Sequence, residues 1–397
     1  MADPVVTGSR PTIWTAKGDW QFANPVRIRF GDGRLDDLAR LELPERVLLV
    51  TTPGFTRRGV TDRVRALIGE VRVVVYDEVE PNPSLDVLDA AAAGLEGKGI
   101  GAIAAVGGGS AMDTAKALAF RLAPGHEVSL AAHFRDGVEL PAVSPLPVIA
   151  VPTTAGTGSE VTPFATIWDR AQNKKYSLAG ERVFPHTAIL DPLLTIGLPE
   201  SETVASGLDA LSQGLESIWN RNANPVTVSY ATRAVALALE TLPGLVRDLS
   251  NAKLRRAMME ASLLAGLAIS STRTALAHSM SYPLTAHYGT PHGLACSFTL
   301  SALCAYNARE DDGRLDRLGR ELGLDGADGL VVRLRSILRE LRVGARVRET
   351  VPGLEAVLSL APEMFTPGRA DNNLAAVDRA AIESILVAAW GDVVDEG

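Results

Sequence analysis

Gly101-Ala-Ile-Ala-Ala-Val-Gly-Gly-Gly-Ser110 leads directly into a helical pattern that continues to about Leu122. An apolar run that ends in glycines just before a helix is typical of the strand–turn–helix units of α/β proteins. The glycines let a ligand approach the backbone closely, and the start of the helix presents free N–H groups to an anion. The pattern is neither the spaced-glycine dinucleotide motif nor a Walker loop, because no Gly-Lys-Ser/Thr closes it. It predicts an anion-binding turn or, more simply, a glycine-rich turn without a ligand.

The alternation of strand and helix extends through the first half of the chain. Further strands are expected at Val26–Phe30, Arg46–Thr52, Val71–Tyr76 and Pro147–Val151, with helices at Thr61–Gly69 and Leu85–Glu96. After about Pro192, helical spacing takes over, at Ser201–Asn220, Val226–Leu242, Leu254–His287, Arg314–Leu322 and Ala375–Trp390. We predict an α/β N-terminal domain with a Rossmann-like parallel sheet, residues 1–192, and an all-α C-terminal domain, residues 193–397. Because ligands of open α/β sheets bind outside the carboxyl ends of the strands, the cleft between the domains is the expected site.

The composition is that of a globular protein with a sizeable core, since 46% of the 397 residues are hydrophobic and 22% are charged. A net charge of −8 argues against general binding to nucleic acid or anionic membranes, because both need a broad basic face. Only two cysteines are present, Cys296 and Cys304, which excludes a disulfide framework. Met1–Arg10 carries no apolar signal core. We expect a cytoplasmic protein that binds neither nucleic acid nor membranes.

A second polar loop follows the strand expected at Pro147–Val151. Hydroxyls and glycines alternate in its sequence, Thr153-Thr-Ala-Gly-Thr-Gly-Ser159. Hydroxyl and backbone N–H groups suit the oxygens of ribose and phosphate. Alone, this loop could equally be a polar turn, but two such loops after two strands of one sheet favour nucleotide binding.

Side chains typical of a metal site gather in the second half of the chain. Three of the six histidines, His278, His287 and His292, lie in one short segment. Asp209 and Gln213 stand four residues apart, so that they share one face of a helix. A carboxylate oxygen with two imidazoles can hold a divalent metal. His278 taken alone fits a hydrogen-bonded core residue equally well, and spacing does not decide between the two.

Four motifs, in this order, resemble those of the iron-containing (group III metal-dependent) alcohol dehydrogenase family. They are Gly107-Gly-Gly-Ser-Ala-Met-Asp-Thr-Ala-Lys116, Pro152-Thr-Thr-Ala-Gly-Thr-Gly-Ser-Glu160, Gly207-Leu-Asp-Ala-Leu211 and His278 followed by Pro291-His-Gly293. The resemblance runs through nearly the whole chain. It implies the dehydroquinate synthase-like fold of that family, NAD(P)-dependent interconversion of alcohols and carbonyls, and a homodimer.

The resemblance also implies a metal centre, with Fe²⁺ or Zn²⁺ as the ion. Carried over by position, its ligands fall on Asp209, Gln213, His278 and His292. Gln213 departs from the family pattern, which has histidine there, and an amide oxygen is a weaker ligand than an imidazole. Loss of the metal therefore stays open as an alternative. Tyr282 stands where the family often has a further histidine, and with His278 it is a candidate catalytic residue that passes on a proton, although packing alone would also explain it.

The implied nicotinamide cofactor would occupy the two polar loops and the end of the strand at Arg46–Thr52. The predicted cofactor-binding residues are Thr52, Gly107, Gly108, Gly109, Ser110, Asp113, Thr153, Thr154, Thr157 and Ser159. NAD-preferring relatives commonly carry an aspartate after that strand, where it binds the ribose 2′-hydroxyl and repels a 2′-phosphate. Thr52, with Arg57 and Arg58 nearby, would tolerate or favour NADP(H), so the predicted cofactor is NADP(H) or NAD(H). The two arginines could also be solvated charges at a helix start.

Within the family, the likeness is to the phosphonate-associated branch, whose members reduce phosphonoacetaldehyde to 2-hydroxyethylphosphonate. General alcohol dehydrogenases have small, neutral residues near the position of Arg273 and an aromatic residue near that of His287. Arg369 lies in a later loop that replaces the usual one. We predict that these three residues bind the dianionic head of the substrate. Alternatively, Arg273 pairs with Glu216 or Glu260.

The predicted function is the metal-dependent and NAD(P)H-dependent reduction of a small anionic carbonyl compound, in the first place phosphonoacetaldehyde. Phosphonopyruvate, sulfoacetaldehyde and a plain short-chain aldehyde are the alternative substrates. Two alternatives of other classes stay open: a lyase or cyclase on the same scaffold, as in dehydroquinate synthase, and a nucleotide-binding protein whose metal site is dead.

Overall fold

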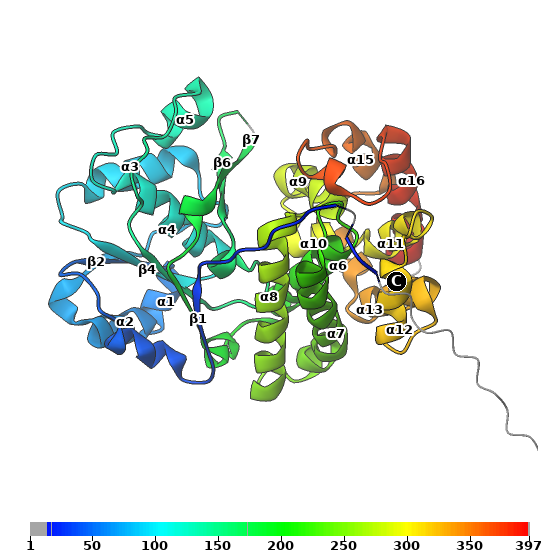
Figure 1. Ribbon diagram of the computed structural model, residues 1–397, viewed down its shortest axis with the longest axis horizontal. Coiled ribbons are helices and arrows are strands. Elements are labelled where there is room, and N and C mark those ends of the chain that lie inside the picture. The colour runs from blue at the N-terminus through cyan, green and yellow to red at the C-terminus, as the bar shows by residue number, and fades with distance from the viewer. Residues whose placement is uncertain (1–13, 17, 173, 396–397) are drawn as a thin grey trace, which may run out of the picture.

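The computed structural model describes residues 14–16, 18–172 and 174–395. Two domains lie side by side, an α/β domain and, after its last strand, a helical domain (Figure 1). The predicted fold class, a parallel sheet followed by an all-α half, is confirmed. Met1–Arg10, on which the expectation of a cytoplasmic protein partly rests, lies outside the described residues.

A six-stranded parallel sheet forms the centre of the α/β domain. Its strands are β1 (Arg27–Phe30), β2 (Val47–Val50), β3 (Val73–Tyr76), β4 (Ala102–Gly107), β5 (Val148–Pro152) and β8 (Thr187–Leu190). They lie in the order β1-β8-β5-β4-β2-β3. The chain leaves β2 for β3 on one side and returns to β4 on the other side. The topological switch point, where such sheets bind ligands, is therefore at the carboxyl ends of β2 and β4.

Helices cover both faces of this sheet. They are α2 (Val60–Ile68) on one face, and α3 (Leu85–Leu95) and α4 (Gly109–Arg121) on the other. The short α1 (Pro53–Arg57) precedes α2, and α5 (Leu130–Asp136) packs on α3. Alternate strand residues point to opposite faces, so that Leu48 and Ile103 pack with α4 while Leu49 and Ala104 pack with α2. Burial on both faces explains why β2, β4 and β5 appear in the sequence as uninterrupted apolar runs.

The sequence does not predict the antiparallel hairpin of β6 (Phe164–Asp169) and β7 (Lys174–Ala179), nor the short strand β8. β7 reads Lys-Lys-Tyr-Ser-Leu-Ala, and Leu178 is its one buried residue, so the apolar run that marks the other strands is missing. The hairpin lies on the side of the α/β domain that faces the helical domain (Figure 1).

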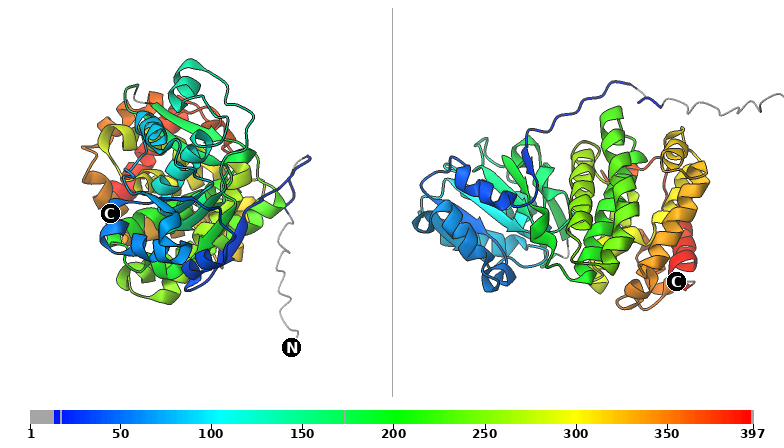
Figure 2. Two further views of the ribbon diagram at one scale, coloured as in Figure 1. Left: turned by 90° about the vertical axis from the view of Figure 1, so that its left-hand side faces the viewer. Right: turned by 90° about the horizontal axis from the view of Figure 1, so that it is seen from below.

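The helical domain begins with three long helices packed on one another: α6 (Glu200–Ile218), α7 (Pro225–Arg247) and α8 (Ala252–Thr272). It continues with α9 (Leu276–Tyr288), α10 (His292–Ser297), α11 (Leu300–Ala308), α12 (Arg314–Glu321), α13 (Gly326–Glu340), α14 (Val343–Arg348), α15 (Leu354–Ser359) and α16 (Arg379–Ala389). Figure 2 shows the first three helices between the sheet and the later helices. Among the described residues, no helix combines the length and apolar character that crossing a membrane requires.

The segment Leu254–His287, expected as one helical stretch, is in fact divided into α8 and α9. Arg273 adopts a φ of 63°, in the left-handed region, which ends α8. The Glu216 carboxylate of α6 accepts hydrogen bonds from the backbone N–H groups of Ala275, at 2.9 Å, and His278, at 3.2 Å. It thereby satisfies N–H groups at the start of α9 that have no partner within the helix. Apolar spacing alone does not reveal such a break.

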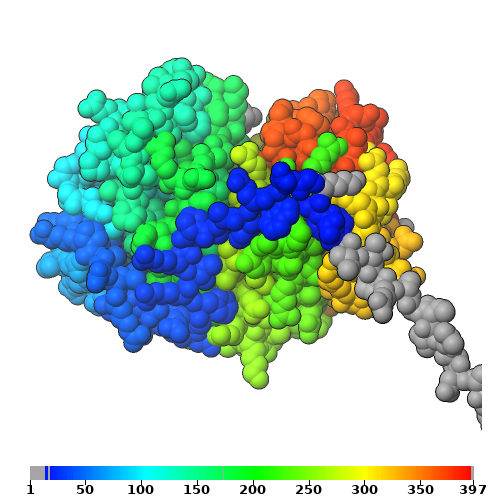
Figure 3. Space-filling view, in the orientation of Figure 1, coloured from blue at the N-terminus to red at the C-terminus, as the bar shows by residue number. Residues whose placement is uncertain are grey.

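A segment ahead of β1 lies on the surface of the helical domain and ties it to the α/β domain (Figure 3). Trp14 packs against Val228, and the Arg314 guanidinium lies 4.8 Å from the centroid of its ring. The Asn24 side chain donates a hydrogen bond to the carbonyl oxygen of Val161 at 2.9 Å.

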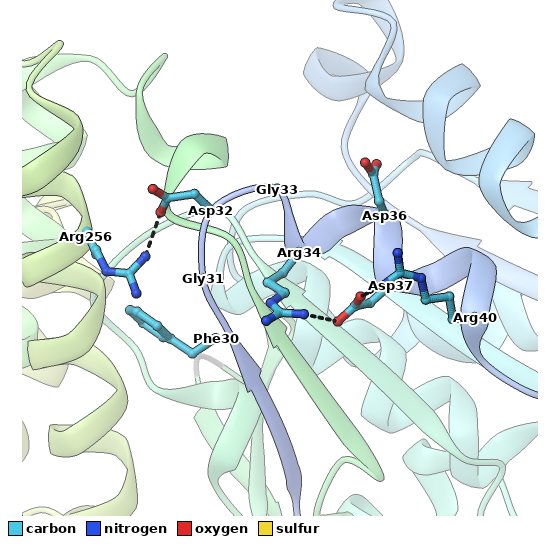
Figure 4. A pocket seen from close by; sticks show the side chains of 9 residues that line it. All are labelled: Phe30, Gly31, Asp32, Gly33, Arg34, Asp36, Asp37, Arg40 and Arg256. Carbon is cyan, nitrogen blue, oxygen red and sulfur yellow. Dashed lines mark hydrogen bonds and ion pairs between the residues drawn. The ribbon is translucent and has the colours of Figure 1, made fainter.

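A polar pocket of about 390 Å³ lies where the end of β1 meets the start of α8 (Figure 4). Its charged residues pair with one another. Arg256 of α8 donates to Asp32 at 2.9 Å, while Asp37 accepts from Arg34 at 3.4 Å and from Arg40 at 3.3 Å. Each of these arginines therefore already pairs with a carboxylate. The pair of Asp32 and Arg256 joins the α/β domain to the helical domain.

Candidate metal and nucleotide site

Four side chains able to bind a metal meet where α6, α9 and α10 come together. They are Asp209, His278, His292 and Cys296, and one ligand atom from each lies within 4.8 Å of the others. His292 is partly exposed and the other three are buried. Oδ1 of Asp209 lies 3.3 Å from Nε2 of His278. The cluster contains three of the four predicted ligands and one residue, Cys296, that the sequence analysis did not assign to the site.

Hydrogen bonds on the far side of each ring orient both imidazoles. Nδ1 of His278 lies 2.6 Å from the Glu216 carboxylate. Nδ1 of His292 lies 3.4 Å from the hydroxyl of Ser281, which itself donates to the carbonyl oxygen of His278 at 2.7 Å. When Nδ1 donates outward and the ring is neutral, a lone pair is left on Nε2 for a metal. Outer hydrogen bonds of this kind are the usual support of metal-binding histidines.

Replacing Glu216 with glutamine is expected to weaken metal binding about 10-fold to 100-fold. Glutamine keeps the size of the side chain and an oxygen that can accept the N–H groups of α9, but it lacks the negative charge that holds His278. Competition with a chromogenic chelator measures the affinity. Glu260→Gln, at a surface carboxylate of α8 that pairs with Arg233 at 3.5 Å, is the matched control. Equal affinities of wild type and Glu216→Gln would contradict this supporting role.

The negative charges in and beside the cluster favour the binding of a cation. The carboxylates of Asp209 and Glu216 are buried beside it. Burial raises the pKa of the Cys296 thiol, but the imidazoles of His278 and His292 lower it to about 6. Burial also opposes the charged form of Asp209, yet the neighbouring imidazoles of His278 and His292 hold its pKa below the ordinary value. The pKa of the His278 imidazole is raised beside the Cys296 sulfur and the Glu216 carboxylate, although burial opposes its charged form. A divalent cation can take the place of its proton.

Gln213, the fourth predicted ligand, lies one turn after Asp209 on α6 and joins the two domains. Its side-chain N–H donates to the carbonyl oxygen of Thr157 at 3.3 Å. Oε1 of Gln213 and Oδ1 of Asp209 are both buried and have no hydrogen-bond partner among the described residues. Two orphaned oxygens beside two oriented imidazoles fit a divalent cation. The side chains present are therefore suited to the metal that the resemblance implies.

The glycine-rich turn lies at the switch point of the sheet. β4 ends at Gly107, and α4 begins at Gly109 without a side chain that caps its first N–H groups, which leaves them for an anion. A Cβ on Gly109 would lie 2.8 Å from Thr157, and one on Gly108 would lie 3.3 Å from Thr154. Glycine at these positions allows the second polar loop to pack directly against the turn.

Two predicted cofactor residues, Asp113 and Ser159, belong to a buried network behind this turn. The Ser159 hydroxyl donates to Asp113 at 2.8 Å. Nζ of Lys116 donates to the Ser159 hydroxyl at 2.9 Å and to the carbonyl oxygens of Thr162 and Phe164 at 3.0 and 2.8 Å. Burial lowers the pKa of Lys116 to about 8, against the opposing charge of Asp113. The network fastens the second loop to α4, and a contact of either residue with the cofactor stays a prediction.

The other predicted cofactor residues flank the loops. Ser110 is partly exposed in the first turn of α4, and Thr153 is buried just after β5. Thr52 precedes α1 and makes no side-chain capping hydrogen bond. A Cβ on Gly54 would lie 3.6 Å from Nη1 of Arg58 and 3.7 Å from Oγ1 of Thr52. Thr52 and Arg58 thus both lie beside Gly54, beyond the carboxyl end of β2.

Positive side chains converge on Tyr282, which lies on α9 beside the metal cluster. Its ring stacks on that of His292 with 6.3 Å between centroids, and Nζ of Lys175 lies 3.7 Å from its own ring centroid. Burial would raise the pKa of the Tyr282 hydroxyl, but the charges of Lys175, His278 and Arg369 hold it below the ordinary value. In the part of the chain that the structure describes, neither Lys175 nor Arg369 forms an ion pair with a carboxylate. Lys175 belongs to the unpredicted β7, and no motif in the sequence points to it.

Arg273 and His287, both predicted to bind substrate, do not belong to this group of residues. Arg273 is exposed at the end of α8 and has no ion pair among the described residues. The pairings proposed for it as an alternative are taken, since Glu216 binds His278 and Glu260 binds Arg233. Nε2 of His287 lies 2.9 Å from the carboxylate of Glu363. Their role in substrate binding stays a prediction.

The hydrogen bond from Gln213 to Thr157 links the metal cluster to the loops at the sheet. A phosphate-type turn at a switch point, joined in this way to a set of metal ligands, defines a metal-dependent oxidoreductase with a nucleotide-binding domain.

Comparisons with known proteins identify the family. The model of the iron-containing alcohol dehydrogenase domain matches residues 25–192, and the model of the C-terminal domain of the Fe-containing alcohol dehydrogenase family matches residues 203–390. The chain belongs to the iron-containing alcohol dehydrogenase family, and the resemblance drawn from its motifs is confirmed.

Individual relatives are similar over most of the chain. A phosphonoacetaldehyde reductase from Streptomyces viridochromogenes is 40% identical over 273 residues, which are 66% of this chain and 67% of that protein. Alcohol dehydrogenase 4 of Schizosaccharomyces pombe is 30% identical over 331 residues, 81% of this chain and 78% of that protein. The crystal structure of sulfoacetaldehyde reductase from Bifidobacterium kashiwanohense with NAD⁺ matches with a TM-score of 0.86 and 30% identity, covering 96% of this chain and 100% of that chain.

Proposed function

We propose that this protein reduces phosphonoacetaldehyde to 2-hydroxyethylphosphonate with NADPH. The observation that carries the proposal is the position of Lys175, whose Nζ lies 3.7 Å from the ring centroid of Tyr282 beside the metal cluster. The charge of Arg369 acts on the same tyrosine. An anionic head group at this place would give both cations the carboxylate-like partner that they lack among the described residues. The relatives from Streptomyces viridochromogenes and Bifidobacterium kashiwanohense support it, since each is named for an aldehyde that carries an anionic group.

Each residue of the site has a separate role in such a reduction. When bound, the metal supplies Lewis-acid polarisation of the carbonyl group, and the reduced nicotinamide supplies the hydride. Lys175 and Arg369 hold the head group of the aldehyde and so fix the approach of its carbonyl carbon. Tyr282, whose pKa is lowered, is placed to give a proton to the oxygen of the product.

The choice of NADPH rests on the residues beyond β2. Thr52 occupies the place where an acidic residue would repel a 2′-phosphate. The guanidinium of Arg58 lies beside Gly54, as the Thr52 hydroxyl does, and 4.5 Å above the ring of Phe55. A cation kept in position there is suited to a 2′-phosphate. Initial rates with NADPH are expected to exceed those with NADH at equal concentration.

Replacing Lys175 with methionine tests the proposed head-group site. Loss of one charge-assisted contact, worth about 1.5–3 kcal/mol, should raise the KM for phosphonoacetaldehyde about tenfold to a hundredfold. The KM for propionaldehyde, which has a similar size and no charge, should stay the same. Lys174→Met is the matched control, because successive residues of a strand point to opposite faces and Lys174 is exposed.

Steady-state rates of NADPH oxidation with phosphonoacetaldehyde, sulfoacetaldehyde, phosphonopyruvate and propionaldehyde complete the test. A wild-type preference for the phosphonate aldehyde that Lys175→Met abolishes supports the proposal. A preference for sulfoacetaldehyde would support the proposed head-group site but show that the substrate is a sulfonate aldehyde. Equal losses on charged and uncharged aldehydes would show that Lys175 does not bind the head group.

A further inference from the structure

We propose that Cys296 is a ligand of the metal, and that its thiolate makes this a zinc site in place of an iron site. The inference rests on the metal site of the proposed function, but it concerns the donor set and not the substrate. It names a residue of α10 that stands outside the four positions at which the family resemblance places ligands.

The distances within the cluster are those of a tetrahedral site. Zinc lies about 2.0–2.1 Å from a nitrogen or oxygen ligand and about 2.3 Å from a sulfur ligand. In a tetrahedral site, the two ligand atoms are then roughly 3.3 Å apart in a nitrogen–oxygen pair and roughly 3.6 Å apart in a nitrogen–sulfur pair. Nε2 of His278 and Oδ1 of Asp209 are 3.3 Å apart. Sγ of Cys296 and Nε2 of His292 are 3.6 Å apart. The Asp209–His278 pair thus already has the spacing that a shared zinc ion imposes. Sγ of Cys296 is also 3.7 Å from Nδ1 of His292, so its side chain must turn toward Nε2 to share that ion.

The local structure directs the Cys296 sulfur to the cluster. Cys296 follows His292 by four residues on α10, which places both side chains on one face of that helix. Cys296 is fully buried, and its sulfur contacts the imidazole of His292. Gln213 gives its amide N–H to Thr157 and keeps Oε1 without a partner among the described residues, so it offers a neutral oxygen and no charge. Cys296 can therefore supply the second anionic donor of the cluster, beside Asp209.

The chemistry of this donor set favours zinc. One thiolate and one carboxylate neutralise a dication, and two imidazoles complete the shell. Soft sulfur ligands suit zinc, and the general order of affinities of such sites for divalent metals places Zn²⁺ above both Mn²⁺ and Fe²⁺. Zinc can expand to five ligands, so a carbonyl oxygen still has access to a site with four protein donors.

Cobalt substitution tests the inference by a readout other than activity. Co²⁺ bound to a thiolate shows an intense sulfur-to-metal charge-transfer band in the near ultraviolet, whereas Co²⁺ bound only to nitrogen and oxygen does not. We expect this band in the wild-type protein after metal removal and loading with one equivalent of Co²⁺. We expect this band to be absent from Cys296→Ser. We also expect Cys296→Ser to bind Zn²⁺ at least about 100-fold more weakly than the wild type, because mutation of a residue that only hydrogen-bonds to a ligand already costs up to about 100-fold. Gln213→Ala should keep the band.

Cys304→Ala is the matched control, because Cys304 is the second buried cysteine and lies away from the cluster on α11. It should keep both the band and the zinc affinity. A wild-type protein that binds Co²⁺ without the band, or binds neither Co²⁺ nor Zn²⁺, overturns the inference even if Cys296→Ser fails to fold. A protein that shows the band but reduces no aldehyde upholds the inference and refutes the proposed function.

Discussion

Asp209→Ala is expected to lose its bound metal and to reduce aldehydes about a thousandfold more slowly, or not at all. The carboxylate is the one charged oxygen of the cluster, and its Oδ1 is buried without a hydrogen-bond partner among the described residues. Its removal leaves two imidazoles without the anion that balances a cation. A metal that stabilises the transition state by several kcal/mol then no longer acts, and about 1.4 kcal/mol corresponds to a tenfold change in rate.

Metal content by mass spectrometry and NADPH oxidation, measured on the same preparation, check this result. Asp209→Asn keeps the volume of the side chain and separates loss of charge from loss of packing. Glu202→Ala, at an exposed carboxylate in the first turn of the same helix, should leave both readouts unchanged. An Asp209→Ala protein that folds, lacks metal and still turns over at the wild-type rate would refute metal dependence.

Gly293→Ala is expected to disrupt the protein almost as severely, by moving α10 away from α6. A Cβ on Gly293 would lie 1.8 Å from the backbone carbonyl oxygen of Ala205, so neither side can give way without moving a helix. Gly293 follows the predicted ligand His292, and Ala205 lies one turn before the predicted ligand Asp209. The substitution therefore separates two of the predicted ligands.

The overpacking should cost about 1–3 kcal/mol of the free energy of unfolding, or more. With a shift of about 2–4 °C per kcal/mol, the Tm should fall by several degrees, and zinc affinity should fall with it. Gly94→Ala is the control, because Gly94 lies on α3 with no atom within 4 Å of its Cβ position. A Gly293→Ala protein with wild-type Tm and zinc affinity would show that the two helices are not packed as described.

Those parts of the fold that bury apolar surface on both sides are predictable from the sequence. β2 and β4 appear as uninterrupted apolar runs, and the glycines after β4 mark the turn into α4. β7 has no such run, because one side of it is exposed. The break between α8 and α9 is hidden because the group that stabilises it, Glu216, lies on a different helix.

Contacts between elements that are far apart in the sequence limit the prediction of the site as well. Asp209, His278 and His292 were found because a known family carries the same motifs. Lys175 acts across the boundary between two domains, and no local pattern reports such a contact. Cys296 follows His292 by one helical turn, and this spacing could have indicated a second donor on the same helix face. Comparison with the family by position assigns the fourth ligand to Gln213 instead.

The central claim is that a metal in the helical domain and a reduced nicotinamide at the sheet together reduce an anionic aldehyde. Its most direct test is turnover of phosphonoacetaldehyde by metal-stripped protein, before and after one equivalent of Zn²⁺ is restored, with NADPH consumption and alcohol formation measured together. The account predicts no turnover without metal and equimolar NADPH oxidation and 2-hydroxyethylphosphonate formation once zinc is restored. Full turnover by protein shown to be free of metal, or product formed without oxidation of NADPH, would contradict it.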